Sequence, residues 1–395
     1  MRIPKKTILV LFWAAIVMTA CSSYEDLEKN RAKRAQTATG DIRIAMVWQE
    51  KLFNSYFYEG AELAADEINK NGGLKGRKIL PVRYNNESGT KTMDMKLVKK
   101  IASDPDMVAI IGHYDWEIEA SVTYEYSGIL FIAAAGSIPG LTQHGFQYVF
   151  RNIPSDRKTG VDLANFVKKI GFSDVLIIDD RTVSGKGLAD IFHERASKIG
   201  INVIARKSYS IREDDFKPLL GEIKKQNFDA IFLGGGIPDA GILIKQAREM
   251  GVVAPFIGGA YLNSTTLWDI AGNAAEGTIT STSFHHDDHY SAAQTFTRKF
   301  YARFHEYPDA WAAHGYDSIR VIANAIEKAG STVPLVVASY LRYIENYEGA
   351  IGTYSFTLEG DVAGEINDFQ VLHDGKFELM EGYYERNLQR FSGTP

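Results

Sequence analysis

Short, mostly apolar runs alternate with amphipathic stretches from residue 41 onward. The first series of runs predicts buried strands at 42–47, 79–84, 107–111 and 129–132. Between them, apolar residues recur at helical spacing, which predicts helices at 59–69, 93–102 and 118–127. The first of these helices is ended by Asn71, Gly72 and Gly73. The first part of the chain is therefore predicted to alternate strand and helix.

A second series of the same kind follows. It predicts strands at 175–178, 203–205 and 230–233. It predicts helices at 161–170, 187–199, 216–226 and 240–250. Beyond residue 280 the pattern predicts helices at 292–305 and 316–328, and strands at 352–358 and 368–372. Continuous apolar strands separated by helices are typical of parallel sheets covered on both faces, so two series divided near residue 155 predict two doubly wound α/β domains.

Composition agrees with a folded protein of two domains. The chain has 395 residues, which is too long for one ordinary core. Hydrophobic residues make up 45% and charged residues 24%, the balance of a globular protein. A net charge of -5 leaves no basic surplus to hold a polyanion, so no nucleic acid is expected as a partner. No segment after the N-terminus has the apolar length needed to cross a bilayer.

The N-terminus has the layout of an export signal. Arg2, Lys5 and Lys6 precede a nearly apolar stretch at 8–18, and small residues then lead to Cys21, the only cysteine of the chain. The run 18–21, Met-Thr-Ala-Cys, resembles the lipobox of bacterial lipoproteins, although leucine is usual where Met18 stands. The resemblance implies cleavage of a signal peptide at 1–20 and acylation of Cys21. The alternative is an ordinary cleaved signal with a chance cysteine.

A lone thiol has no intrachain disulfide partner, which favours the lipidation hypothesis. Two or more acyl chains hold a protein at a membrane durably, whereas one does not. Residues 21–40 are polar and rich in charge, and they are interpreted as a tether between membrane and globule. The expected location is therefore the periplasmic or extracellular face of a bacterial membrane, reached by the lipid anchor alone.

Five stretches together resemble type I periplasmic solute-binding proteins of the branched-chain amino acid class. They lie at 58–79, 108–156, 214–236, 246–252 and 270–278. The resemblance implies two doubly wound lobes, a hinge of three crossing segments, and solute capture in the cleft between the lobes. It assigns residues 41–154 and 284–358 to lobe 1, and residues 155–283 and 359–385 to lobe 2. It also implies a monomeric binding protein that is not an enzyme and needs no cofactor.

Residue by residue, the amino-acid pocket of that family is only partly kept. The small hydroxyl residue that binds a carboxylate falls on Ser137, beside the backbone of Ala135. A second such serine falls on Trp116, and the acidic partner of an α-ammonium falls on Ala260. Tyrosines expected near Ser184 and Gly236 are absent. Because a buried ammonium without a counter-charge is costly, these losses argue against a standard amino acid as ligand.

Aromatic and small residues occupy the expected cleft instead. Small loops follow predicted strands at 133–137, which includes Gly136, and at 234–236. Such loops let a ligand approach backbone N–H groups and helix N-termini. The aromatic residues at or beside cleft positions are Phe53, Tyr114, Trp116, Tyr261 and Trp311. The predicted ligand is an aromatic or otherwise apolar acid held by Ser137, and the alternative is a quaternary amine in an aromatic cage.

Three functions stay open at this level. The leading one is capture of a small organic solute for an ABC importer, whose permease subunits are the expected partners. The second is a sensing role, in which the same clamp reports occupancy to a signalling receptor. The third is a secreted metal-dependent enzyme that uses the run His-His-Asp-Asp-His at 285–289, although a solvated loop beside the hinge is the preferred interpretation. The chain contains no GxSxG, HExxH, P-loop or paired CxxC motif.

Overall fold

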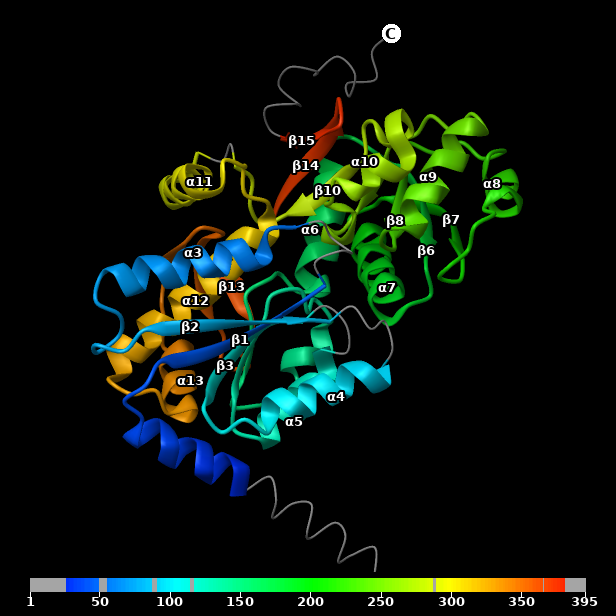
Figure 1. Ribbon diagram of the computed structural model, residues 1–395. Helices are drawn as coiled ribbons and strands as arrows, with labels where there is room; N and C mark the ends of the chain where they lie inside the picture. Colours follow the sequence, from blue (N-terminus) through cyan, green and yellow to red (C-terminus); the bar gives the residue numbers. More distant parts are fainter. Residues whose placement is uncertain are drawn as a thin grey trace, which may run out of the picture.

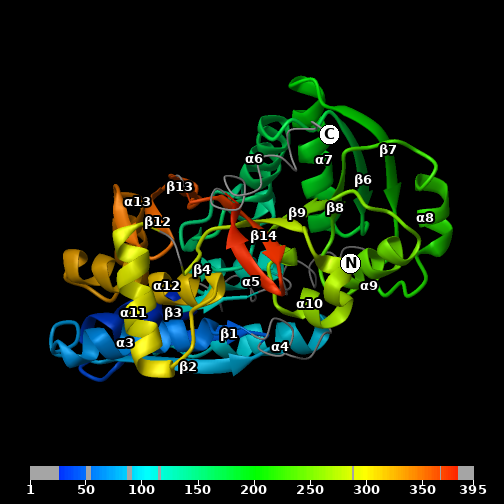
Figure 2. The ribbon, with the colours of Figure 1, turned by 90° about the horizontal axis from the view of Figure 1, so that it is seen from above.

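The chain folds into two lobes, each built on its own sheet (Figure 1). The structure is a computed structural model, and it describes residues 26–49, 55–86, 91–113, 117–286, 289–364 and 366–380. Figure 2 separates the lobe that carries α3, α12 and α13 from the lobe that carries α6, α7, α8 and α9. The α/β class and the two parallel-sheet lobes predicted from the sequence are confirmed.

The sheet of lobe 1 has five parallel strands in the order β2-β1-β3-β4-β5. The strands are β1 (Ile42–Trp48), β2 (Ile79–Asn85), β3 (Met107–Gly112), β4 (Leu130–Ala133) and β5 (Val149–Arg151). The intervening helices are α3 (Phe57–Lys70), α4 (Lys91–Ala102), α5 (Glu117–Tyr126) and the short η1 (Pro139–Thr142). All parallel strands end at the same edge, so the loop after β4 lies at the carboxyl edge, where open sheets bind ligands.

The sheet of lobe 2 has seven strands in the order β15-β14-β10-β9-β8-β6-β7. Five parallel strands form its body: β6 (Asp174–Asp179), β7 (Asn202–Ser208), β8 (Ala230–Gly234), β9 (Phe256–Gly258) and β10 (Ile279–Thr282). The chain returns later to add β14 (Asp368–His373) and β15 (Lys376–Leu379) in antiparallel pairing. The helical segments are α6 (Asp156–Lys169), α7 (Val183–Lys198), α8 (Lys217–Ile223), α9 (Asp239–Glu249), η2 (Ala260–Leu262), α10 (Thr266–Ala271) and η3 (Gly272–Ala275).

Both sheets are covered on both faces. In β1, Ile44 and Met46 join one apolar cluster, whereas Ala45 and Val47 join another. The same alternation divides β6 between the two clusters of lobe 2. Successive side chains of a strand point to opposite faces, so each sheet carries two cores.

The segment after β10 returns to lobe 1. It forms α11 (Ser291–Phe304), α12 (Ala310–Ala329), α13 (Pro334–Arg342) and a small antiparallel sheet of β11 (Tyr347–Gly349), β12 (Gly352–Phe356) and β13 (Val362–Gly364). Helix α12 crosses α3 so closely that a Cβ atom at Gly60 would lie 1.9 Å from the carbonyl oxygen of Ala312. Because β13 pairs with β12, the chain leaves lobe 1 after Gly364, later than the predicted boundary at residue 358.

The structure describes residues 26–40 of the predicted tether, and this part is not the extended linker that the sequence suggested. Residues 26–37 are helical, and Arg31 is only 1% exposed. Its guanidinium donates hydrogen bonds to the carbonyl oxygens of Ala102, Asp104, Met107 and Ser127 at 2.6–3.1 Å. These carbonyls lie at the ends of helices and at the start of β3, where backbone acceptors lack helical partners. One arginine therefore docks a polar segment against lobe 1, at the edge of the sheet opposite the carboxyl ends.

Among the described residues, no individual helix is both long and apolar enough to cross a membrane. Helices α12 and α13 meet that test only as a pair, across a 103° bend. Much of α12 is buried inside lobe 1, as the core helix of a globular domain is.

Candidate functional site

A cleft lies between the two lobes, at the carboxyl ends of β4, β9 and β10. The space enclosed within it is about 20 Å³, and the hollow together with the open solvent at its mouth is about 400 Å³. Its lining residues are Ser137, Ile153, Pro154, Asp156, Thr159, Leu188, Gly259, Ala260, Tyr261, Ser281, Thr282, Ser283 and Asn367. They come from the loop after β4, from α6 and α7, from η2, and from the segments that cross between the lobes. This position agrees with ligand binding at the carboxyl edge of open parallel sheets.

Two hydroxyl groups meet across the cleft. The Oγ atom of Ser137, from lobe 1, lies 3.0 Å from the phenolic oxygen of Tyr261, from lobe 2. The Tyr261 hydroxyl also lies within hydrogen-bond distance, 3.3 Å, of the carbonyl oxygen of Ala135. These contacts hold the lobes together on the side of the cleft formed by the loop after β4.

A buried carboxyl group lies beside this pair. Asp156 is the first residue of α6 and is 3% exposed. Its carboxylate accepts a hydrogen bond from the hydroxyl of Ser184 at 3.3 Å, and its backbone N–H donates to the carbonyl oxygen of Ser137 at 2.8 Å. Burial raises the pKa of Asp156 to about 6, although the nearby hydroxyl groups of Ser137 and Ser184 and the charge of Arg151 act in the opposite direction.

A buried histidine supports the other side of the cleft. The hydroxyl of Ser283, which lines the cleft, lies 2.6 Å from Nε2 of His314 on α12. Burial lowers the pKa of His314 to about 3, so its ring is neutral at physiological pH. The backbone carbonyl of His314 accepts a hydrogen bond from the Asn152 side chain at 3.1 Å.

The structure brings together several of the residues predicted for the site. Ser137, Ala260 and Tyr261 line the cleft, and the carbonyl of Ala135 contacts Tyr261. A Cβ atom added at Gly236 would lie 3.4 Å from the Cβ of Tyr261, so the loop after β8 passes close to this tyrosine.

Three other predicted residues lie one step away from the cleft. Ser184 is not among the lining residues, but its hydroxyl donates a hydrogen bond to Asp156, which lines the cleft. Gly136 is a buried residue of the loop after β4, and a Cβ atom added to it would lie 2.9 Å from the side chain of Leu141. Trp311 is 4% exposed and packs in the core of lobe 1, with its ring centroid 5.2 Å from that of Trp48. Its position at the N-terminal end of α12, against β1, explains why a ring expected in the cleft is in the core.

Three of the predicted rings, Phe53, Tyr114 and Trp116, lie outside the described residues, as does the predicted lipidation site Cys21. Among the described residues, sequence reasoning missed Asp156, the serines of β10 and the following segment, and Asn367. Asp156 carried a usable signal, because it directly follows a serine at the point where the chain crosses between lobes. Acidic residues are common in the first turn of a helix, because the helix dipole favours them there. Asp156 therefore did not stand out in the sequence as a residue of the site.

The predicted histidine run is not a solvated loop throughout. His285 is 6% exposed, and its Nε2 atom lies 2.8 Å from the carbonyl oxygen of Phe377 in β15. Its ring stacks on His286 with centroids 4.4 Å apart. Asp287 and Asp288 lie outside the described residues. The described part of the run therefore helps to attach the returning strands to the hinge segment.

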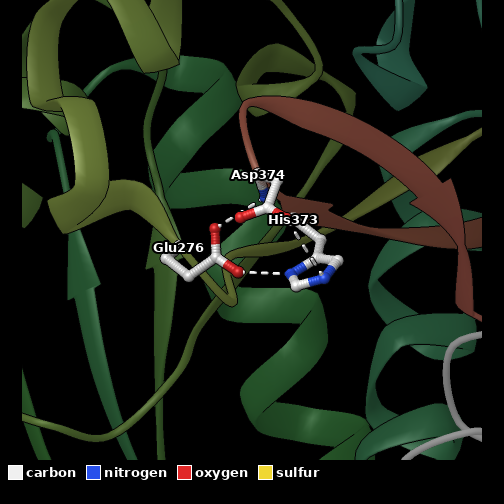
Figure 3. A group of neighbouring side chains, drawn as sticks. All are labelled: Glu276, His373 and Asp374. Atoms are coloured by element: carbon white, nitrogen blue, oxygen red, sulfur yellow. Dashed lines mark hydrogen bonds and ion pairs between the residues drawn. The ribbon is translucent and has the colours of Figure 1, made fainter.

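A group of metal-ligand residue types lies elsewhere, at the far end of lobe 2 (Figure 3). Glu276, His373 and Asp374 place one ligand atom each within 4.8 Å of one another. Nδ1 of His373 lies 2.5 Å from Glu276, and the backbone N–H of Asp374 donates to the same carboxylate at 3.0 Å. The hydrogen bond from His373 to Glu276 raises the pKa of the histidine. These bonds tie the β14–β15 turn to the loop before β10, about 20 Å from the cleft at ~3.3 Å per strand residue.

Comparisons with known proteins agree with this arrangement. A model of the periplasmic binding protein family matches residues 52–368. The chain is 29% identical over 356 residues to Leu/Ile/Val-binding protein homolog 3 of Brucella melitensis, covering 88% of this chain and 95% of the relative. It is 29% identical over 349 residues to the leucine-specific-binding protein of Salmonella typhimurium, covering 85% of this chain and 92% of the relative.

A solved structure shows the same relationship. An ABC transporter substrate-binding protein from Desulfitobacterium hafniense, in complex with Leu, is 30% identical to this chain, with a TM-score of 0.77. The match covers 86% of this chain and 99% of that protein.

Two parallel-sheet lobes around a shared cleft define a solute-binding protein of the extracytoplasmic type. The chain belongs to the periplasmic binding protein family, in the type I, branched-chain amino acid class. The family consists of binding proteins and not of enzymes, so the cleft serves to capture a solute.

Proposed function

We propose that this protein is a lipid-anchored, extracytoplasmic solute-binding protein that delivers a small organic molecule to an ABC importer. The observation that carries the proposal is the cleft between the lobes, closed by the contact between Ser137 and Tyr261. A contact between side chains from two hinged lobes forms only when the lobes approach one another. A clamp of this kind captures a guest by closing on it.

The ligand is proposed to have an apolar or aromatic body of modest size. The cleft walls combine apolar side chains, such as Ile153 and Leu188, with the ring of Tyr261 and a small number of hydroxyl groups. This mixture is typical of pockets that enclose an apolar body and orient one polar end. Phe53, Tyr114 and Trp116 are proposed to complete the wall. Truncation of such an aromatic anchor, Trp116→Ala, is expected to weaken binding by roughly 2–4 kcal/mol while leaving folding intact.

Membrane attachment is proposed to occur through acylated Cys21. The chain between this cysteine and the helical residues 26–37 is short, and Arg31 fixes that helix to lobe 1. Lobe 1 is therefore proposed to be held near the membrane, with lobe 2 free to close. Metabolic labelling with a fatty-acid analogue tests the anchor, with Cys21→Ala as the control. Label retained in Cys21→Ala would contradict the anchor and leave solute binding unaffected.

A thermal-shift screen tests the binding function. The purified protein, residues 22–395, is unfolded in the presence of each member of a library of amino acids, aromatic acids and amines. A ligand that binds only the native state raises the melting temperature, and the increase grows with the logarithm of the ligand concentration relative to its Kd. At least one small organic solute is expected to give a concentration-dependent increase. The absence of any increase across the library would contradict the proposal.

Partnership with an importer is tested separately. The binding protein and candidate permease and ATPase subunits of an ABC importer are reconstituted in proteoliposomes, and uptake of the solute found in the screen is measured. Uptake that requires both the binding protein and ATP is the expected result. Binding without any uptake, together with copurification of a receptor, would favour the sensing role instead.

A further inference from the structure

Helix α13 carries apolar side chains on both of its faces. Its inner face packs into the core of lobe 1 through Val337, Ala338 and Leu341. The outward positions form a stripe at helical spacing and hold no charged residue: they are Leu335, Val336, Ser339, Tyr340 and Tyr343. The outward face of a surface helix is ordinarily polar or charged. The composition of this face therefore indicates a surface that contacts something other than water.

Exposed apolar side chains are concentrated at this place. Of the thirteen large hydrophobic residues that are exposed in the described part of the chain, four belong to the stripe, and Leu358 adjoins it. The carbonyl oxygen of Leu358 accepts a hydrogen bond from Nε of Arg342 at 2.9 Å, which places Leu358 beside the end of α13. A gathering of this kind marks an interaction site, whereas single scattered residues do not.

These five residues are named the α13 patch: Leu335, Val336, Tyr340, Tyr343 and Leu358. None of them is among the residues that line the cleft, so the patch is separate from the solute site.

The α13 patch lies beside the docked helix at 26–37, which is dark blue in Figure 1. Just before α13, the hydroxyl of Thr332 donates to the carbonyl oxygen of Ala35, in the last turn of the docked helix, at 3.0 Å. At the other end of α13, Arg342 donates to the carbonyl oxygen of Gln147 at 2.7 Å. The start of α13 is therefore next to the end of the docked helix.

The first turn of the docked helix is close to the opposite end of α13. Tyr148 directly follows Gln147 and donates its hydroxyl to the carboxylate of Glu28 at 2.6 Å. The two helices therefore run side by side in opposite directions. Cys21 lies five residues before Asp26, and a fully extended chain of that length spans about 18 Å at most. An acyl chain on Cys21 would therefore enter a bilayer near the C-terminal end of α13.

We propose that the α13 patch binds the surface of the lipid bilayer. The proposal rests on the proposed acylation of Cys21, and it extends that proposal by naming the face of lobe 1 that contacts lipid. Tyrosine suits the boundary between headgroups and acyl chains, because its ring is apolar and its hydroxyl stays hydrated there. Helix α13 has 9 residues, which is too few to span a bilayer, so it lies in the plane of the interface.

The docked helix adds positive charge beside the patch. Lys29 and Lys33 are exposed on it. Lysines close to a membrane are attracted to anionic headgroups. The anchor also holds the patch at the bilayer at a high effective concentration, so even a weak contact with lipid is populated. A second copy of the chain has no such advantage. Contact along α13 fixes the orientation of lobe 1 on the membrane, so that closure of the cleft is a movement of lobe 2.

A fluorescence experiment tests the patch without relying on acylation. Residues 22–395 contain all of the described fold and lack Cys21, the only cysteine of the chain. An N-terminal hexahistidine tag replaces the acyl anchor on vesicles of phosphatidylethanolamine and phosphatidylglycerol that contain a nickel-chelating lipid. Ser339→Cys supplies a single thiol in the middle of the stripe for an environment-sensitive fluorophore. Val253→Cys is the matched control, because Val253 is 90% exposed in lobe 2.

Spin-labelled lipids in the vesicles quench a fluorophore that reaches the bilayer. The fluorophore at Ser339→Cys is expected to lose intensity when these lipids are present, and its emission is expected to shift to shorter wavelength. The fluorophore at Val253→Cys is expected to show neither change.

Substitution of the patch separates contact with lipid from proximity to the anchor. Leu335→Glu with Tyr343→Glu, in the Ser339→Cys protein, places charges on the face and keeps the tag, so loss of the quenching is expected. Tyr307→Glu with Val253→Glu adds the same charges at exposed positions outside the patch, and the quenching is expected to persist. Thermal melting checks the fold. If the double variant of the patch does not fold, Tyr343→Glu alone replaces it, because Tyr343 is 80% exposed.

Three results would overturn the proposal and leave solute capture and the anchor intact. The first is a fluorophore at Ser339→Cys that is unquenched, or quenched only as strongly as at Val253→Cys. The second is quenching that survives Leu335→Glu with Tyr343→Glu. The third is a dimer in sedimentation velocity that the same double variant abolishes, without quenching by lipid, which would assign the patch to a second copy of the chain. Failure of the anchor is recognised separately by metabolic labelling, since the tagged protein tests the patch in either case.

Discussion

The hydroxyl oxygens of Ser137 and Tyr261 lie 3.0 Å apart, although the two residues are 124 positions apart in the sequence and belong to different lobes. Ser137 follows β4 of lobe 1, and Tyr261 belongs to η2 of lobe 2. The same Tyr261 hydroxyl donates to the carbonyl oxygen of Ala135 at 3.3 Å, so one oxygen atom carries both of these contacts between the lobes. Closure of the cleft can therefore be perturbed at one oxygen atom.

The substitution Tyr261→Phe removes that oxygen and keeps the ring. A hydrogen bond of this kind stabilises the closed form by about 0.5–1.5 kcal/mol, so ligand affinity is expected to decrease about two- to tenfold. Calorimetry with the solute found in the screen measures the change, and thermal melting checks the fold. Unchanged affinity would show that the contact does not contribute to closure.

The substitution Arg31→Met tests the docking of the N-terminal helix. Four backbone carbonyls lose a charged donor, so the free energy of unfolding is expected to fall by about 3 kcal/mol, with ligand affinity unchanged. The matched control is Arg34→Ala, which removes an exposed ion pair with Asp106 and is expected to cost less than about 1 kcal/mol. Urea denaturation measures both. Equal, small effects would contradict the anchoring role of Arg31.

The close crossing of α3 and α12 is tested by Gly60→Ala. The added methyl group would collide with the backbone of Ala312, and a loss of about 2–3 kcal/mol in the free energy of unfolding is expected. Gly221 on α8 provides the control, because an added Cβ there meets no atom within 4 Å. Gly221→Ala is expected to stabilise the protein by roughly 0.5–1 kcal/mol. If Gly60→Ala were as stable as Gly221→Ala, the observed packing would be wrong.

Stability should depend on pH through Asp317, which is buried in α12 and accepts the backbone N–H groups of Ala350 and Ile351 at 2.8 and 3.0 Å. Burial raises the pKa of Asp317 to about 7. Between pH 4 and pH 7 the native protein holds a proton that the unfolded chain releases, so this group's contribution falls as the pH rises, by up to ~4 kcal/mol.

The difference between the unmodified protein and Asp317→Asn isolates this contribution. His113 and His314 act in the opposite direction, because burial lowers their pKa values to about 3 and stability is lost as the pH falls below 6.5. Urea midpoints are measured for both proteins from pH 4 to pH 8. The difference between the two unfolding free energies is expected to decrease with increasing pH, and a constant difference would contradict the assignment.

Much of the fold was predictable because buried parallel strands leave a strong apolar signal. The strand predicted at 42–47 is β1, Ile42–Trp48, and the strand predicted at 107–111 is β3, Met107–Gly112. The start of α7 was missed by several residues. Thr182 caps this helix by accepting from the N–H of Gly185, and the glycines beyond it weakened the helical pattern.

The docked helix at 26–37 could not be predicted from its composition. Its attachment depends on one buried side chain, Arg31, in a segment whose other residues are mostly polar and partly exposed. The residues of the site likewise depend on tertiary contacts that composition and local pattern do not reveal. Ser137 and Tyr261 were identified by resemblance, whereas the signal at Asp156 was weak, because acids are common in the first turn of a helix, and the fold was needed to show that Asp156 lines the cleft.

Binding of a small organic solute in the cleft between the lobes is tested most directly by calorimetric titration with the solute found in the screen, repeated at several temperatures. One saturable site per chain is expected, with a negative change in heat capacity because apolar surface is buried, and with weaker binding in Tyr261→Phe. Saturable binding that is indifferent to Tyr261→Phe, or no saturable heat at all, would contradict the account.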